Sequence, residues 1–163
     1  MGGNNTVPMP ALREALAAAG FGAPATVLNS GNMAVTTALP LTEARAGIEP
    51  VLAEEFDAAV AVLVFEAADV EAMIARYPWD RGDGTRQHYA VLMDDLAVAA
   101  ELLASARVVP GAEGLAPAPV GLYYWAFKGR TTAGEIAKQL SAARFMKHNS
   151  VRAVATLDKL LRA

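Results

Sequence analysis

The residues best suited to chemistry lie in two polar, glycine-containing turns near the start of the chain. Residues 2–5 read Gly-Gly-Asn-Asn, and residues 29–32 read Asn-Ser-Gly-Asn. Asparagine amides and backbone N–H groups that converge in such turns form a concave site for an anion or a polar small molecule. Asn and Ser also hydrogen-bond within their own turns, and that interpretation stays open. The candidate ligand-binding residues here are Gly3, Asn4, Asn5, Asn29, Ser30 and Asn32.

Two arginines are further candidates for holding an anion. Arg130 lies in Gly129-Arg130-Thr131-Thr132, just before a helix predicted from about residue 131 to 142. A helix N-terminus can seat a phosphate, but a threonine that simply caps the helix explains the same residues, and the spacing is not that of a P-loop. Arg152 belongs to a basic cluster with Arg144, Lys147 and His148, at a predicted junction between two helices.

The residues typical of catalysis are few. His88 and His148 are the only histidines, there is no cysteine, and neither histidine has the spacing of a metal site or a catalytic triad. Asp94-Asp95 could hold a divalent cation or cap the helix that follows, and capping is the simpler interpretation. We expect no metal and no cofactor, and the sequence leaves open whether the protein is an enzyme.

Composition and charge narrow the class of protein. The chain has 163 residues, 54% of them hydrophobic, and no apolar run of membrane-spanning length, so we expect a cytoplasmic protein without a membrane partner. Residues 1–123 hold 6 Lys/Arg and 15 Asp/Glu, a net charge of −9, while residues 124–163 hold 8 Lys/Arg and 2 Asp/Glu, a net charge of +6. The basic end either neutralises the acidic part or meets an acidic partner. Nucleic-acid binding is not expected, because the aromatic strand Val120–Phe127 lacks the signature of RNA-binding modules.

The order of predicted elements in the first half is helix, strand, strand, helix, strand. The helices are predicted at 11–19 and 42–56, and the strands at 25–28, 33–37 and 60–65. One further strand before the first helix would complete the βαββαβ plait of ferredoxin-like proteins. We therefore predict an α+β fold of two ferredoxin-like lobes, residues 1–66 and 67–163, with the first strand of the N-terminal lobe missing.

The second half is predicted as a looser version of the same arrangement. Helices are expected at 68–76, 96–105, 131–142 and 151–161, and strands at 87–93, 107–109 and 120–127. The Pro/Gly-rich stretch 110–119 is predicted to be an exposed loop.

The missing strand would be central in the plait, and its loss would leave two strand edges without partners. Several ladder hydrogen bonds, each of about 0.5–1.5 kcal/mol, would be lost. We expect that residues upstream of Met1, or a strand from another chain, normally fill this gap. A homodimer through exposed strand edges is one form of that expectation.

The two turns and the residues around them resemble the bacterial domain-of-unknown-function family 1697. The resemblance is carried by Gly2-Gly3-Asn4-Asn5, by Val7, Met9, Leu12 and Arg13 after it, and by the turn 29–32. Family members have a strand and an Arg-Gly-Ile-Asn sequence before the glycines, and both are absent here. The resemblance implies a two-lobed ferredoxin-like architecture and no established activity.

Together these features predict a binding module for a small anionic or phosphate-bearing ligand at the edge formed by the two turns, which we call the Asn/Gly edge. The alternatives are an enzyme that acts on an anionic substrate at that edge, with Arg130 or Arg152 holding the anion, or a protein-interaction subunit completed by a partner strand.

Overall fold

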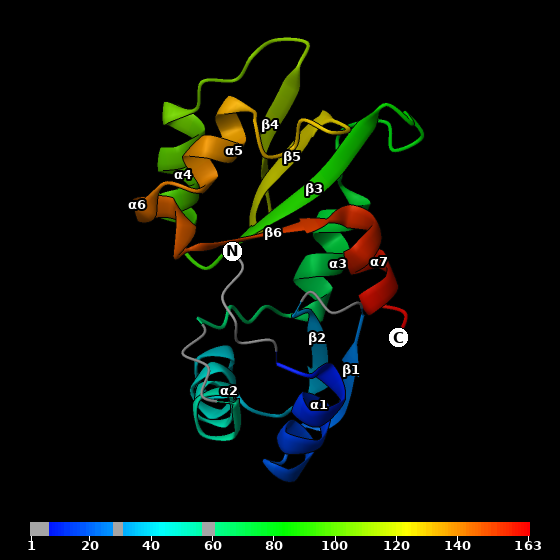
Figure 1. Ribbon diagram of the computed structural model, residues 1–163, viewed down its shortest axis with the longest axis vertical. Helices are drawn as coiled ribbons and strands as arrows, with labels where there is room; N and C mark the ends of the chain where they lie inside the picture. Colours follow the sequence, from blue (N-terminus) through cyan, green and yellow to red (C-terminus); the bar gives the residue numbers. More distant parts are fainter. Residues whose placement is uncertain (1–6, 28–30, 57–60) are drawn as a thin grey trace. The chain divides into compact units, whose positions relative to one another are not determined.

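A computed structural model describes residues 7–27, 31–56 and 61–163 (Figure 1). The chain divides into two compact units, and each is described by itself below. The first unit comprises Met1–Ala67 together with Lys159–Ala163, and the second comprises Ala68–Asp158. Both units mix helices with antiparallel strands, which confirms the predicted α+β class.

The first unit contains the predicted helices and hairpin. Helix α1 (Met9–Ala18) follows Pro8 and ends before Gly20, whose φ of +93° favours glycine. Strands β1 (Gly22–Thr26) and β2 (Met33–Thr36) pair antiparallel, and α2 (Leu41–Phe56) follows them. One apolar cluster holds the unit together, and its buried members are Met9, Leu12, Leu16, Phe21, Ala44 and Leu52.

The strand predicted at residues 60–65 is not present in the part that the structure describes. Residues 61–66 belong to no helix and no ladder, although Val62 and Val64 pack against the core of the unit. In the plait order the last strand pairs only with the first strand, so these residues need that neighbour to form a ladder. Val62 and Val64 are spaced as in a strand that buries alternate side chains. The segment becomes a strand only if its backbone also forms hydrogen bonds with a neighbouring strand.

The second unit has the complete strand order of a ferredoxin-like plait. Its strands are β3 (Arg86–Met93), β4 (Glu113–Ala118), β5 (Gly121–Phe127) and β6 (Asn149–Ala153). They lie in the order β4-β5-β3-β6, and every neighbouring pair is antiparallel. Helix α4 (Leu96–Ser105) connects β3 to β4, and α5 (Glu135–Leu140) and α6 (Ala143–Met146) connect β5 to β6. Helices α3 (Ala67–Ala75) and α7 (Val154–Leu160) precede and follow this set.

Three predictions for the second half were wrong. The stretch 110–119 is mostly strand β4. Pro117 does not prevent this, because β4 is an edge strand, where a residue without an N–H group is tolerated. Residues 107–109 are a loop. The helix expected from residue 151 begins at Val154, because residues 149–153 pair with β3 as strand β6.

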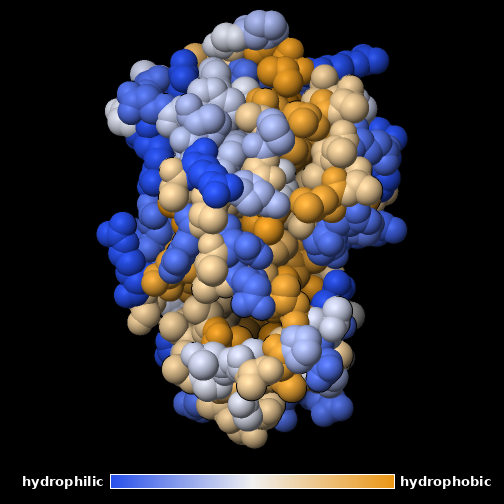
Figure 2. Space-filling view, turned by 180° about the vertical axis from the view of Figure 1, so that it is seen from behind, coloured by the Kyte–Doolittle hydropathy of each residue, from blue (hydrophilic) through white to orange (hydrophobic). Residues whose placement is uncertain are grey.

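The sheet of the second unit is covered on one face by helices α4, α5 and α6 (Figure 1). Tyr124, Val91 and Leu122 point to this face and pack with Leu102 and Ile136, all of them almost fully buried. Neighbouring residues on the strands point the other way, and the Tyr123 hydroxyl donates to the Met73 carbonyl of α3 at 2.9 Å. Polar and apolar residues are interspersed on the outer surface of both units (Figure 2).

Gly121 is the residue that the β4–β5 hairpin depends on. It follows the two-residue connection 119–120 with a φ of +138°, and a Cβ there would overlap the Val91 carbonyl of the neighbouring strand. Any side chain would therefore both strain the backbone and separate β5 from β3.

We predict that Gly121→Ala lowers the free energy of unfolding by roughly 2–5 kcal/mol, from overpacking and backbone strain together. Urea unfolding of the full chain measures it. Gly84→Ala is the matched control, because a Cβ at Gly84 meets nothing within 4 Å, and its effect should stay within about 0.5 kcal/mol. Equal effects of the two changes would show that the close approach at Gly121 is not what limits the hairpin.

Candidate functional site

The structure describes two residues of the Asn/Gly edge, Gly31 and Asn32. Gly3, Asn4, Asn5, Asn29 and Ser30 lie outside the described residues. Gly31 has a φ of +73°, and Asn32 is a buried polar residue immediately before β2. The convergence of the two turns therefore stays a prediction.

Arg152 lies in strand β6 rather than at the junction of two helices. It is opposite Ala90 of β3, is partly buried, and donates from Nη1 to the Val151 carbonyl at 2.9 Å. Burial lowers the pKa of its guanidinium below the usual value. The predicted basic cluster is thus spread over a strand and the elements before it.

Two other members of that cluster face acidic side chains of the second unit. Arg144 forms a salt bridge with Glu101 at 2.9 Å, and His148 Nδ1 lies 2.9 Å from Asp94 Oδ1. These pairs are what is expected if the basic end neutralises acidic groups of its own unit.

The helix after Arg130 begins later than predicted, and the threonines do not cap it. Helix α5 starts at Glu135. Its N-cap residue is Gly134, which has no side chain that could accept from the N–H groups of the first turn. The carboxylate of Glu113, from strand β4, lies there instead and accepts from the Ile136 N–H at 3.5 Å. Because Glu113 already occupies the start of α5, the N–H groups of the helix do not form a phosphate seat by themselves, and an anion in this region would need a positively charged side chain to hold it.

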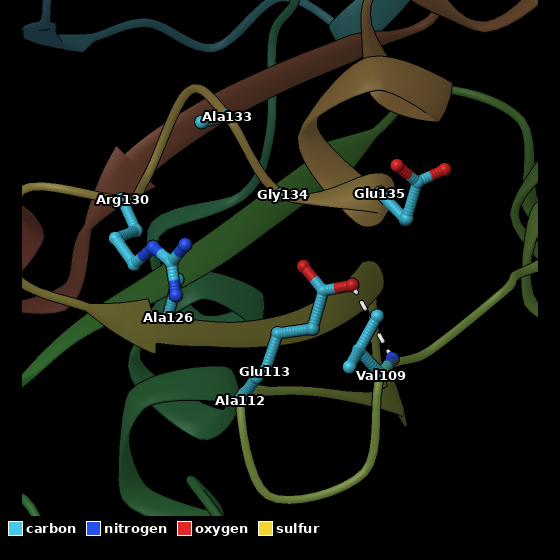
Figure 3. A pocket seen from close by; sticks show the side chains of 8 residues that line it. All are labelled: Val109, Ala112, Glu113, Ala126, Arg130, Ala133, Gly134 and Glu135. Carbon is cyan, nitrogen blue, oxygen red and sulfur yellow. Dashed lines mark hydrogen bonds between the residues drawn. The ribbon is translucent and has the colours of Figure 1, made fainter.

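Arg130 and Glu113 line one pocket of about 210 Å³ in the second unit (Figure 3). Glu113 is only 5% exposed, whereas Arg130 is exposed. Both side chains extend into the space between β5 and the segment that leads to α5. The remaining lining residues are Val109, Ala112, Ala126, Ala133, Gly134 and Glu135.

Glu113 is held by few hydrogen bonds. Its Oε1 accepts from the Val109 N–H at 3.4 Å, and its Oε2 accepts from Ile136. Gly134 leaves room for the carboxylate, since a Cβ at residue 134 would overlap Glu113 Oε2. The charge of Glu113 also acts on Tyr124, whose pKa is raised to about 12 by burial first and by Glu113 second.

Sequence reasoning included Arg130 among the candidates but missed Glu113. The glutamate lies in the Pro/Gly-rich stretch that was interpreted as an exposed loop, where an acidic residue carries no signal. A strand assignment for 113–118 would have shown that its side chain points with Leu115 toward the helix-covered face.

The histidines and acidic pairs are engaged in local structure. Asp95 caps α4, accepting from the Ala97 and Val98 N–H groups at 2.8 and 3.3 Å, which confirms the capping interpretation. His88 Nδ1 lies 3.1 Å from the Tyr77 hydroxyl, a pair that sequence reasoning missed. No group of three His, Asp or Glu residues that could hold a metal ion occurs in the ranges 7–27, 31–56 and 61–163.

His88 is placed where a positive charge is unfavourable. Its Nε2 is buried and has no hydrogen-bond partner among the residues described, and burial lowers the pKa of the imidazole below 6.5. The Tyr77 hydroxyl also lies 3.1 Å from the Tyr124 carbonyl, to which it donates. When the Tyr77 hydroxyl donates to the Tyr124 carbonyl, the donor in its contact with His88 is Nδ1.

The aromatic residues of β5 do not form one stacking surface. Tyr124 faces the helices α4 and α5, while Tyr123 and Trp125 point to the opposite face, and all three are at most 5% exposed. Bases cannot stack on rings that are buried in this way.

These features define an α+β protein with a ferredoxin-like unit and a small charged pocket. The family described as "Protein of unknown function (DUF1697)" matches residues 1–117, and the chain belongs to that family. No curated protein matches the chain. A solved structure, that of a conserved bacterial protein from Streptococcus pneumoniae, is similar with a TM-score of 0.79 at 22% identity, covering 99% of this chain and 91% of that one. This likeness shows the fold alone.

No helix in the described part of the chain combines the length and the apolar character needed to cross a membrane.

We predict that the close fit of Gly134 and Glu113 appears as coupling in a double-mutant cycle. Gly134→Ala alone should cost about 1–3 kcal/mol of stability, because the new methyl group displaces the carboxylate. In a Glu113→Ala background the same change should be neutral or stabilising by about 0.4–1 kcal/mol, since alanine restricts the unfolded chain. Chemical unfolding of the four proteins measures the coupling, and additive effects would contradict the packing described here.

We predict that His88 makes the protein less stable in acid. Because the pKa of His88 is lowered in the folded state, the unfolded state takes up the proton first, and stability falls as the pH drops through about 6.5. The slope of unfolding free energy against pH, between about pH 7.5 and 5, should be smaller in His88→Gln.

A slope in His88→Gln equal to that of the parent protein would rule out the proposed role of His88 burial.

Proposed function

We propose that this chain is a binding module for a small ligand that carries an anionic group, and that Arg130 supplies the positive charge that holds it. The observation that supports this most directly is the position of Arg130 at a pocket of about 210 Å³ (Figure 3). Concave sites with a few placed polar groups are the usual form of a small-molecule site.

The guanidinium of Arg130 is available for such a ligand. Within the described ranges, neither a salt bridge nor a side-chain hydrogen bond engages it, and Glu113 across the pocket does not pair with it. Arginine binds carboxylate and phosphate groups with two parallel N–H donors, which gives both energy and orientation. The size of the pocket favours a molecule smaller than most drugs.

The Asn/Gly edge is the alternative place for this ligand and stays a prediction. An enzyme that acts on an anionic substrate at the Asn/Gly edge, with Arg130 or Arg152 holding the anion, also stays a prediction, as does a homodimer through strand edges.

We predict that Arg130→Ala weakens the binding of small anions by about tenfold or more, because a hydrogen bond to a charged group contributes about 1.5–3 kcal/mol. Propionate and inorganic phosphate are the probes, titrated separately while the amide NMR signals of the full chain are followed. Shifts should map to residues 109–113 and 130–135. Lys147→Ala is the matched control, because this exposed lysine lies outside the pocket lining, and it should bind like the parent protein.

Saturable shifts that map to Asn32 and survive Arg130→Ala would move the site to the Asn/Gly edge. A dissociation constant of about 1 mM corresponds to about 4 kcal/mol of binding free energy, so even a weak site would be detected with about 50 mM probe. If neither probe shows saturable binding up to that concentration, the proposed function is rejected.

A further inference from the structure

Two opposite charges share the pocket of the second unit without pairing with each other. Arg130 and Glu113 both extend into it, and no salt bridge joins them. Opposite charges that face one cavity this way attract a molecule that carries the complementary charge at each end.

Glu113 has acceptor capacity left for a ligand. An ionised carboxylate offers about four lone-pair positions, and among the residues that the structure describes two long hydrogen bonds, of 3.4 and 3.5 Å, use them. At 5% exposure the side chain is also cut off from most solvent. Burying a carboxylate without full compensation is unfavourable, so a cationic group beside it would stabilise it.

The rest of the pocket suits a short carbon chain. Val109, Ala112, Ala126 and Ala133 contribute apolar atoms to its lining. A cavity of about 150 Å³ holds a molecule of the size of benzene, so about 210 Å³ accommodates roughly six to nine non-hydrogen atoms.

We propose that the ligand is a small zwitterion, with an ammonium group at Glu113 and a carboxylate at Arg130. This inference rests on the proposed function and makes it more specific. A purely anionic molecule gains the attraction of Arg130 but meets the negative charge of Glu113 in the same pocket. A zwitterion satisfies both, and its carbon chain fills the apolar part of the pocket.

The test compares probes that differ only in charge. Glycine, β-alanine and γ-aminobutyrate form a series in which the two charges move apart, while propionate lacks the ammonium group and propylamine lacks the carboxylate. Calorimetry and amide NMR on the full chain measure affinity and location. At least one member of the series should bind at residues 109–113 and 130–135 about tenfold more tightly than propionate or propylamine.

Glu113→Gln keeps the size and the acceptor oxygen of the side chain but removes its charge. This change should abolish the advantage of the zwitterion and leave propionate binding equal or tighter. Glu14→Gln, an exposed glutamate of the first unit, is the matched control and should change neither. Ala133→Leu fills the pocket from an exposed position with Glu113 intact, so it should weaken every probe even if Glu113→Gln unfolds the protein.

The outcomes separate this inference from the function beneath it. If propionate binds through Arg130 but no zwitterion exceeds it, the zwitterion is rejected and the anion-binding function stands. If zwitterions bind tightly and Glu113→Gln leaves their affinity unchanged, the role of Glu113 is rejected. If no probe binds at the pocket, both the zwitterion inference and the proposed anion site at Arg130 are rejected.

Discussion

The second unit depends on the pairing of β3 along both of its edges. Residues 86–92 of this strand pair with β5, and residues 89–93 pair with β6. A strand with partners on both sides satisfies its backbone donors and acceptors, which would otherwise cost free energy in a buried sheet. Both faces of the sheet, and the segments that carry Glu113 and Arg130, take their positions from this central strand.

In the described part of the first unit, packing of side chains and pairing of the backbone do not coincide. Strands β1 and β2 form a hairpin, and residues 61–66 lie against the core without joining a ladder. Apolar packing alone places such a segment, but it does not convert the segment into a strand. Burial of side chains and bonding of the backbone are separate requirements, and the two units of this chain satisfy them to different extents.

The pocket shows how a plait can hold a charge inside a small protein. A glutamate on an edge strand reaches the start of a short helix, where N–H groups lack partners within the helix and the dipole favours negative charge. Gly134 makes the approach possible by leaving out a side chain. The same contacts that stabilise α5 therefore also keep a carboxylate beside a solvent-accessible arginine.

Much of the fold could be predicted from local patterns in the sequence. The Gly20 stop and the 29–32 turn marked α1, β1 and β2, and Asp95 marked the start of α4. Strand β6 was not recognised, because Val151 is its only β-branched residue among polar or small ones, and pairing with β3 makes these residues a strand. Arg130 could be predicted as a candidate binding residue because it precedes a predicted helix. Glu113 could not, because its role depends on which face of β4 its side chain occupies.

Pro117 misled the sequence interpretation, and its place in the sheet has a further consequence. Strand β4 is an edge of the four-stranded sheet, and exposed edges tend to recruit strands from other molecules. Pro117 has no backbone N–H, and Pro119 follows directly after the strand, so this edge offers an interrupted row of donors. The residue that looks like a loop signal acts as protection against aggregation along the side of the sheet that carries Glu113.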